Sequence, residues 1–360
     1  MSPRAIRHQV GQLLVAGFDG TSLPVELRAI AREFSLGGII FFARNVESPE
    51  QVAEVSSDAR RLTRETPPWI SVDQEGGRVA RFRRPFTEWP PMLSLGRAGD
   101  EDLARRFARA LAAELTAVGV TLDFAPVLDI LTNPQNSVIG DRALGDEAAL
   151  VGRLGAAITE ELQRAGVAAC GKHFPGHGDT IADSHHDLPL VEHAPDRLRA
   201  VEFEPFRAAV RAGVASLMVA HVLVPAFDET RPSSLSPVIL RLIRQELGFD
   251  GVVFTDDLDM RAIADRRSIP EAAVEAIAAG CDAVLICSGR SDIQVAALEA
   301  LVHAVEEERV PYARIEDALR RQRLMKERFL ARPDIQRLDW RTVVGRESHA
   351  AVAAEMAQFL

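Results

Sequence analysis

Apolar residues in this chain gather into eight short runs, and each run is followed by a stretch with the period of an amphipathic helix. The runs are continuous rather than alternating, which is typical of strands buried on both faces of a parallel sheet. Eight such units without a long linker favour an α/β fold built as a single (β/α)8 TIM-like barrel. The predicted strands are Gln12–Phe18, Gly38–Phe42, Trp69–Val72, Val120–Phe124, Val167–Cys170, Ser216–Ala220, Val252–Phe254 and Asp282–Ile286.

Helices are expected between the runs, for example at Pro49–Thr63, Glu101–Val118, Glu147–Ala165, Arg197–Ala212, Pro237–Glu246 and Pro270–Ala279. Five of them are followed by a glycine that can end a helix in the left-handed conformation, namely Gly119, Gly166, Gly213, Gly248 and Gly280. From about Leu301 the chain indicates extra helices that pack on the barrel, so we expect residues 1–360 to form one catalytic domain. A doubly wound open sheet is the alternative, but no Gly-x-Gly-x-x-Gly follows the first run.

Composition narrows the classes of function. The chain has 360 residues, 47% of them hydrophobic, and a net charge of −10, which argues against binding to nucleic acid or to an anionic membrane. The N-terminal apolar stretch is interrupted by Gln12 and Gly17, and nothing resembles a signal peptide or a membrane span. Three cysteines without a Cys-x-x-Cys pair suit a reducing compartment. We therefore expect a cytoplasmic protein, and we expect it to be a monomer.

Titratable side chains concentrate in the segment Lys172–Pro189, which reads KHFPGHGDTIADSHHDLP. Five of the nine histidines lie in it or just after it, and Gly176 and Gly178 are expected to let this loop close. The segment follows a predicted strand, and barrels carry their working residues just past the strand ends. Asp73 and Asp256 follow two other predicted strands in the same way. The sequence therefore predicts one shared pocket.

Asp256 is the sharpest single candidate for chemistry. Asp256 and Asp257 are adjacent, and neighbouring side chains of an extended chain point to opposite sides, so we expect one to face the pocket and the other to anchor the loop. The alternative is that they cap the next helix. In the His-rich loop, Asp183 can reach the ring of His185, fix its tautomer and raise its pKa, which suits an acid and base near neutral pH.

Four further residues suit a polyhydroxylated ligand, because Lys172, Arg81 and Arg142 only donate hydrogen bonds, whereas Asp73 accepts them. The alternative for Asp73 and Arg81 is an ordinary salt bridge at the rim. A metal site is the main competing chemistry, because His173 and His177 are four residues apart, which would place them on one face of a helix. The proline and glycines between and after them disfavour a helix, so no metal and no other cofactor are expected.

These motifs resemble those of the glycoside hydrolase family 3 β-N-acetylglucosaminidases, in particular the single-domain bacterial enzymes of peptidoglycan recycling. The resemblance rests on Gly37–Asn45, Val72–Val79, Asn136–Arg142, the KHFPGHGDT-IA-DSH loop and the Thr255-Asp256 segment, in that order. It implies that the protein is a β-N-acetylhexosaminidase. The substrate it implies is a small carbohydrate or muropeptide, from which terminal β-linked N-acetylglucosamine is removed.

Carried over to this chain, the resemblance implies Asp256 as the nucleophile, His185 as the acid/base and Asp183 as its partner. Asp73, Arg81, Arg142, Lys172 and His173 would bind the terminal sugar. Larger family members continue into a second domain, which we do not expect here. Three alternatives stay open: a phosphorylase that uses the same site, a non-catalytic sugar-binding barrel and a metal-dependent hydrolase.

Overall fold

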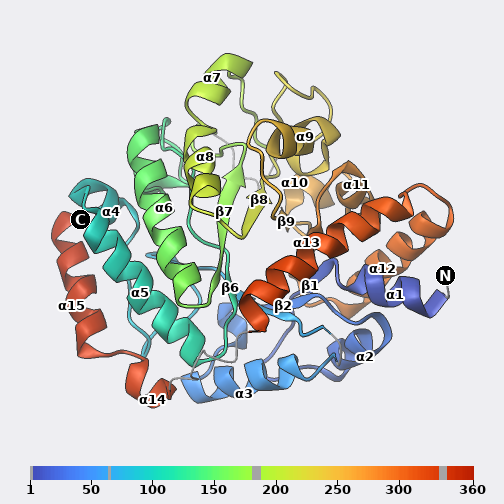
Figure 1. The fold of residues 1–360 in the computed structure, drawn as a ribbon, viewed down its shortest axis with the longest axis horizontal. Helices are drawn as coiled ribbons and strands as arrows, with labels where there is room; N and C mark the ends of the chain where they lie inside the picture. Colours follow the sequence, from blue (N-terminus) through green and yellow to red (C-terminus); the bar gives the residue numbers. More distant parts are fainter. Residues whose placement is uncertain (1–2, 64–65, 181–187, 332–338) are drawn as a thin grey trace.

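The chain folds into a closed barrel of eight parallel strands surrounded by helices (Figure 1). The structure is a computed structural model, and it describes residues 3–63, 66–180, 188–331 and 339–360. Around the barrel the strands follow the order β1-β10-β9-β8-β7-β6-β3-β2. The predicted (β/α)8 barrel is therefore confirmed, and the open sheet is excluded because β1 pairs with both β2 and β10.

The eight barrel strands match the eight predicted runs closely. They are β1 Leu14–Ala16, β2 Gly38–Phe41, β3 Trp69–Val72, β6 Leu122–Asp123, β7 Ala168–Phe174, β8 Ser216–Val219, β9 Val252–Asp257 and β10 Ala283–Ile286. Two of them run further than predicted, since β7 includes Lys172 and His173 and β9 includes Thr255 to Asp257. The hairpin of β4 Gln74–Gly76 and β5 Val79–Ala80 was not predicted.

Helices connect the strands and form the outer layer. They are α1 Pro3–Gly11, α2 Val25–Phe34, α3 Pro49–Arg60, α4 Leu93–Ala98, α5 Glu101–Ala117, α6 Ala148–Arg164, α7 Pro195–Ala200, α8 Glu204–Arg211, α9 Pro237–Gln245, α10 Arg261–Ala264, α11 Ile269–Ala279, α12 Ser291–Glu306, α13 Tyr312–Leu330, α14 Trp340–Val343 and α15 Glu347–Met356. Short 3₁₀ turns lie at η1 Ala43–Asn45, η2 Gly140–Arg142, η3 Ser233–Leu235 and η4 Ala357–Phe359. The five predicted helix-ending glycines all have positive φ, between 64° and 129°.

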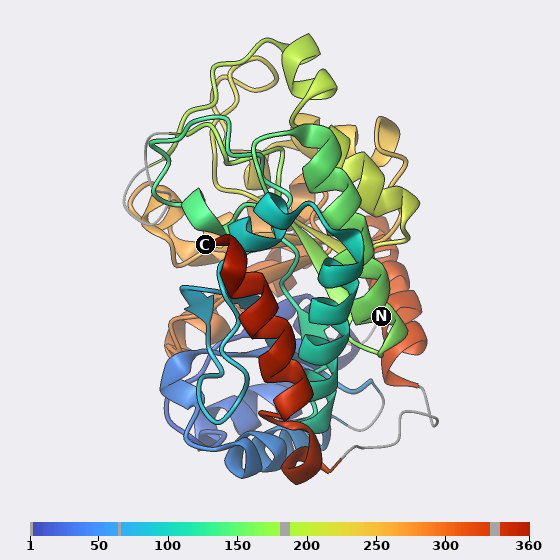
Figure 2. The same ribbon diagram turned by 90° about the vertical axis from the view of Figure 1, so that its left-hand side faces the viewer.

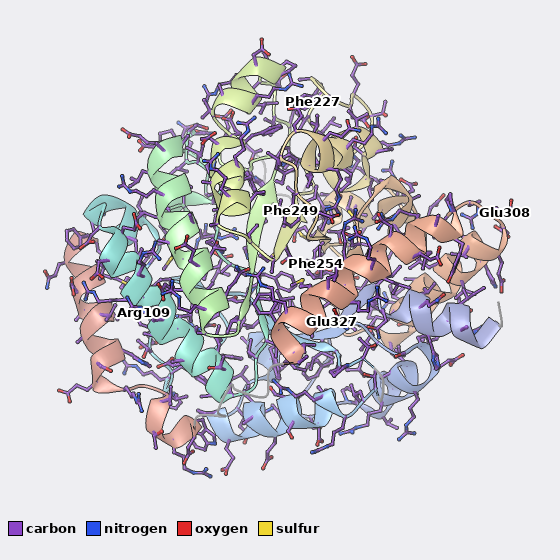
Figure 3. All side chains as sticks on the ribbon, viewed as in Figure 1. Arg109, Phe227, Phe249, Phe254, Glu308 and Glu327 are labelled. Atoms are coloured by element: carbon purple, nitrogen blue, oxygen red, sulfur yellow. The ribbon has the colours of Figure 1, made fainter. Side chains whose placement is uncertain are left out.

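Large apolar side chains fill the barrel. Phe124 and Phe254 meet edge to face with their ring centroids 5.5 Å apart, and Figure 3 labels Phe254 among the strands. Such a pair excludes water and adds about 0.5–1.5 kcal/mol beyond the burial of its area. The barrel interior below the strand ends is therefore a packed apolar core.

Helix α13 closes the amino-terminal end of the barrel, and it passes across the strands in Figure 1. Its Met325 and Phe329 belong to the same apolar cluster as the barrel interior. The buried ammonium of Lys326 donates to the carbonyl of Gly37, which directly precedes β2, and to Gln12 before β1. The barrel interior is thus closed at its amino-terminal end.

The last helix, α15, lies beside α5 (Figures 1 and 2). Glu355 of α15 forms a two-pronged ion pair with Arg106 of α5, with N–O distances of 2.6 and 2.7 Å. The helices expected after about Leu301 are therefore present and pack on the barrel layer. None of the helices within the described ranges is both long and apolar enough to span a bilayer.

Candidate active site

A pocket of about 240 Å³ lies at the carboxyl-terminal ends of the strands. It brings together Asp256 and all five side chains that were predicted to bind a sugar. Its lining consists of Asp73, Glu75, Arg78, Val79, Arg81, Val138, Arg142, Lys172, His173, His177, Met218 and Asp256. The predicted Asp183 and His185 lie outside the residues that the structure describes.

Strand geometry explains why two of these side chains point into the pocket. In β9, Val252 and Phe254 belong to the cluster that fills the barrel, so alternation places Asp256 on the same inward side at the mouth. In β7, the inward position of Cys170 does the same for Lys172. The sequence pattern ended β7 early because Lys172 is polar, although this lysine is buried.

Lys172 is held between two carboxylates. Its Nζ lies 2.8 Å from Oδ1 of Asp73 and 2.6 Å from Oε1 of Glu75, and its side chain is 2% exposed. Burial alone would lower the pKa of this ammonium, but the charges of Asp73 and Glu75 outweigh burial and raise it. Lys172 therefore stays charged and presents a fixed donor to the pocket.

Glu75 is the organising carboxylate that the sequence reasoning missed. Both of its oxygens accept from the guanidinium of Arg142, at 2.8 Å each, and its side chain is 1% exposed. Burial would raise the pKa of Glu75, but Arg142 and Lys172 outweigh it and lower that pKa. A signal existed, because Glu75 stands two residues after Asp73, and that spacing brings two side chains to one side of an extended chain.

Asp129 orients His173. Its Oδ2 lies 2.6 Å from Nδ1 of His173, and its Oδ1 accepts the backbone N–H of His177 at 2.7 Å. Burial would raise the pKa of Asp129, but His173 outweighs it and lowers that pKa, so the carboxylate is charged and Nδ1 carries a proton. Nε2 of His173 then lies towards Arg142, at 3.5 Å. No local pattern in the sequence points to this partner, which is 44 residues away along the chain.

The segment that precedes the undescribed residues 181–187 is firmly packed. Asn136 donates to the carbonyl of His177 at 2.7 Å, and the ring of His177 meets the hydroxyl of Thr180 at 2.7 Å. Burial lowers the pKa of His177 to about 4, so this ring is neutral at neutral pH. A Cβ at Gly178 would come within 1.7 Å of the Ile130 carbonyl oxygen, so close packing accounts for this glycine.

Two arginines of the β4–β5 segment border the pocket. Arg81 lies 3.4 Å from Asp73, and its guanidinium carbon stands 5.1 Å from the ring centroid of Phe42, so the salt bridge considered from the sequence does form. Arg78 donates to the carbonyls of residues 137, 138 and 139 and pairs with Asp141. Arg78 therefore ties the loop that carries Arg142 to the hairpin.

Asp257 fastens the chain next to Asp256, as the alternation predicted. Its Oδ1 accepts the backbone N–H groups of Asp259 and Cys287, at 3.1 Å each, which joins the end of β9 to the end of β10. Burial, with a contribution from Asp259, raises the pKa of Asp257 to about 8. Asp256 therefore lines the pocket while its neighbour holds the backbone.

Metal ligands were also considered. Within residues 3–63, 66–180, 188–331 and 339–360, no three His, Cys, Asp or Glu side chains are arranged to hold a metal ion. The three cysteines are free and buried.

Known proteins with similar sequences are glycoside hydrolases. Residues 5–324 match the N-terminal domain of glycosyl hydrolase family 3. A β-hexosaminidase of Thiobacillus denitrificans is 45% identical over 282 residues, which cover 76% of this chain and 78% of that protein. A β-hexosaminidase of Nitrosomonas eutropha is 42% identical over 281 residues, covering 76% of this chain and 80% of that protein.

Two solved structures are similar throughout the barrel. A glycoside hydrolase family 3 β-N-acetylglucosaminidase from Paenibacillus sp. str. FPU-7 has a TM-score of 0.92 and 42% identity, covering 98% of this chain and 68% of that one. NagZ from Neisseria gonorrhoeae in complex with N-trifluoroacetyl-D-glucosamine has a TM-score of 0.80 and 34% identity, covering 97% and 98%. With its barrel, its pocket and these matches, the chain belongs to glycosyl hydrolase family 3.

Proposed function

We propose that this protein, a family 3 glycoside hydrolase of the β-hexosaminidase type, removes terminal β-linked N-acetylglucosamine from peptidoglycan fragments such as GlcNAc-anhydroMurNAc-peptides. One observation carries the proposal: Asp256 shares a small pocket with Lys172, Arg142, His173 and Asp73. A carboxylate beside several fixed donors and an acceptor suits attack on a sugar whose hydroxyls are held.

The reaction is retaining hydrolysis in two displacements. An oxygen of Asp256 attacks the anomeric carbon while the glycosidic bond breaks, and His185, protonated and oriented by Asp183, gives its proton to the leaving oxygen. In the second step His185 takes a proton from water, and the water oxygen displaces Asp256 from the anomeric carbon. The products are the free sugar and the aglycone. The enzyme returns to its starting state, with Asp256 ionised and His185 protonated.

The remaining residues bind the terminal sugar. Lys172 and Arg142 donate to its hydroxyls from positions fixed by Glu75, and Asp73 accepts. His173, held by Asp129, offers its second ring nitrogen to the pocket. Because these groups are placed before substrate arrives, little of the binding free energy is lost to ordering them.

The choice of an acetamido sugar is supported by the relatives. The Paenibacillus protein is named a β-N-acetylglucosaminidase, and the gonococcal structure holds an N-acylated glucosamine. Resemblance to recycling enzymes supports a peptidoglycan fragment as substrate and the cytoplasm as its place of action. Three free, buried cysteines suit that reducing compartment. We further propose that residues 1–360 act as one domain and as a monomer, which sedimentation of the purified chain tests.

Substrate class is tested with a panel of aryl β-glycosides that differ only at C2. The proposal expects the 2-acetamido glucoside to be hydrolysed with a kcat/KM at least about 100-fold above that of the 2-hydroxy glucoside, which corresponds to about 3 kcal/mol. Equal rates would reject the acetamido preference. Running the panel with and without phosphate identifies the alternative, since a phosphorylase would release the sugar 1-phosphate.

The nucleophile is tested by Asp256→Asn. The amide keeps the shape of the side chain but is a poor nucleophile, so turnover should fall by about 10⁴-fold or more while the melting temperature stays close to that of wild type. The matched control is Asp265→Asn, which alters an exposed carboxylate that pairs with Arg261 on α10. Near-normal hydrolysis by Asp256→Asn would reject the assignment.

A further inference from the structure

His221 is a buried histidine that the proposed reaction does not use. It lies two residues after the end of β8, and it has no exposed surface. Nδ1 of its ring lies 2.7 Å from the hydroxyl of Ser234, and Nε2 lies 2.9 Å from the backbone carbonyl oxygen of Asp257. Among the described histidines, His173 and His177 line the pocket, and His221 does not.

The contacts of His221 define its protonation at one position. A carbonyl oxygen only accepts hydrogen bonds, so Nε2 must carry a hydrogen and donate it to Asp257. Nδ1 can then accept from the hydroxyl of Ser234, which completes a neutral ring with both nitrogens paired. This chain of hydrogen bonds connects η3, which contains Ser234, to the end of β9.

Asp257 connects the hydrogen bonds of His221 to the proposed nucleophile, Asp256. Its backbone N–H donates to Oδ1 of Asp256 at 2.8 Å. Its carbonyl is the group that His221 holds, and its carboxylate accepts from the backbone of Asp259 and Cys287. The carbonyl that His221 holds belongs to the peptide group that follows Asp257, whereas the N–H that contacts Asp256 belongs to the peptide group that precedes it. Holding the carbonyl therefore limits the rotation about the Cα of Asp257 that would turn this N–H away from the Asp256 carboxylate.

We propose that His221 is a positioning residue, which aims the nucleophilic carboxylate of Asp256 at the anomeric carbon by holding the main chain of Asp257. This inference rests on the proposed function, since it takes Asp256 to be the nucleophile. The imidazole is not part of the pocket lining. Its effect is geometric, and a displacement of about 1 Å at a reacting group can reduce a rate by about 100-fold.

Two substitutions separate the Nε2 donor from the rest of the ring. His221→Gln places an amide N–H near the position of Nε2 and can still donate to Asp257. His221→Asn is shorter, so its amide reaches only towards Ser234. Each variant keeps one of the two contacts of His221, Gln the one to Asp257 and Asn the one to Ser234, so each serves as the control for the other.

The measurement is the rate at which a 5-fluoro-N-acetylglucosaminyl fluoride inactivates the purified full chain by forming a covalent sugar–enzyme bond. Its fluoride leaves without help from an acid, so the rate reports on the nucleophile and not on His185. For His221→Asn we expect an inactivation rate constant about 100-fold below wild type, with saturation at a similar donor concentration. His221→Gln should recover most of that loss. The folded fraction of each variant is measured by calorimetry, and each rate is divided by it. A variant that is only partly folded is therefore not mistaken for one with a slower nucleophile.

The inference is overturned if His221→Asn is labelled within about twofold of the wild-type rate, or if the Gln and Asn variants are slowed equally. Should the Asn variant fail to fold, Ser234→Ala carries the test, because it removes only the partner of Nδ1 and should slow labelling in the same direction by about tenfold. An unchanged rate in Ser234→Ala then contradicts the inference. Failure of the underlying function looks different, since wild type would then carry no label on Asp256.

Discussion

Replacing Glu75 by glutamine tests how the sugar-binding donors are held. Glu75 accepts from Arg142 through both oxygens and lies 2.6 Å from the ammonium of Lys172, and all three side chains are at most 10% exposed. Glutamine has the same shape but no charge, and its NH2 group faces a cation. Two buried cations therefore lose a partner, a change that costs about 3–5 kcal/mol of unfolding free energy.

This loss of unfolding free energy corresponds to a lower melting temperature. An unfolding entropy of about 2.1 cal/mol/K per residue gives about 0.76 kcal/mol/K for the chain, so Glu75→Gln should melt about 4 to 7 °C below wild type at pH 7. The pKa of Glu75 is lowered in the folded state, so its contribution is present above the unfolded pKa of about 4.3 and is lost at lower pH. The difference between variant and wild type should therefore narrow in acid.

The Glu75→Gln substitution should also lower kcat/KM. Arg142 and Lys172 lose the partner that aims them, and each charge-assisted hydrogen bond to the sugar is worth about 1.5–3 kcal/mol, so kcat/KM should fall by about 10- to 150-fold. The control is Glu88→Gln, which removes an exposed pair with Arg84 and should cost less than about 1 kcal/mol. A Glu75→Gln variant that melts within about 1 °C of wild type and keeps its kcat/KM would show that Glu75 does not hold these donors.

Three shorter predictions follow from other buried charges. Burial, helped by Asp259, raises the pKa of Asp257 to about 8, so wild-type stability should fall as pH rises from about 4 to about 8. Asp257→Asn, which can still accept hydrogen bonds, should remove this slope in urea titrations, and an unchanged slope would contradict it. Burial lowers the pKa of Lys326 to about 7, so its protonated form opposes folding, and stability should rise with pH between about 7 and 10. Lys326→Met should flatten that rise, whereas a persistent rise would assign it to another group. Asp129→Asn should free the ring of His173 and raise KM by about tenfold or more, and an unchanged KM would show that His173 needs no orienting carboxylate.

The barrel was predictable from the sequence because its strands are continuous apolar runs, which can be recognised without knowledge of tertiary contacts. Prediction failed where function interrupts that signal. Lys172 and His173 are polar yet lie within β7, so the pattern ended this strand at Cys170. The hairpin β4–β5 was missed for the same reason, since Gln74–Gly76 is polar and contains a glycine, and the side chain of Gln74 bonds to the backbone of Arg81 and Phe82.

The pocket was predictable as a set of strand-end residues, because a barrel brings the carboxyl ends of all its strands to one rim. What the sequence could not supply were the partners of those residues. Asp129 meets His173, and His221 meets Asp257, across 44 and 36 residues of chain. Such pairs depend on which loops fold over which strands, and no local pattern encodes that distance.

Mapping the site of a covalent label shows directly whether Asp256 forms the bond to the sugar. The wild-type chain is inactivated with 5-fluoro-N-acetylglucosaminyl fluoride, digested and mapped by mass spectrometry. We expect the added sugar mass on the peptide that contains Asp256, and none in Asp256→Asn treated in the same way. Label on another carboxylate of the pocket, such as Asp73 or Glu75, or turnover of the donor without any labelled peptide, would contradict it.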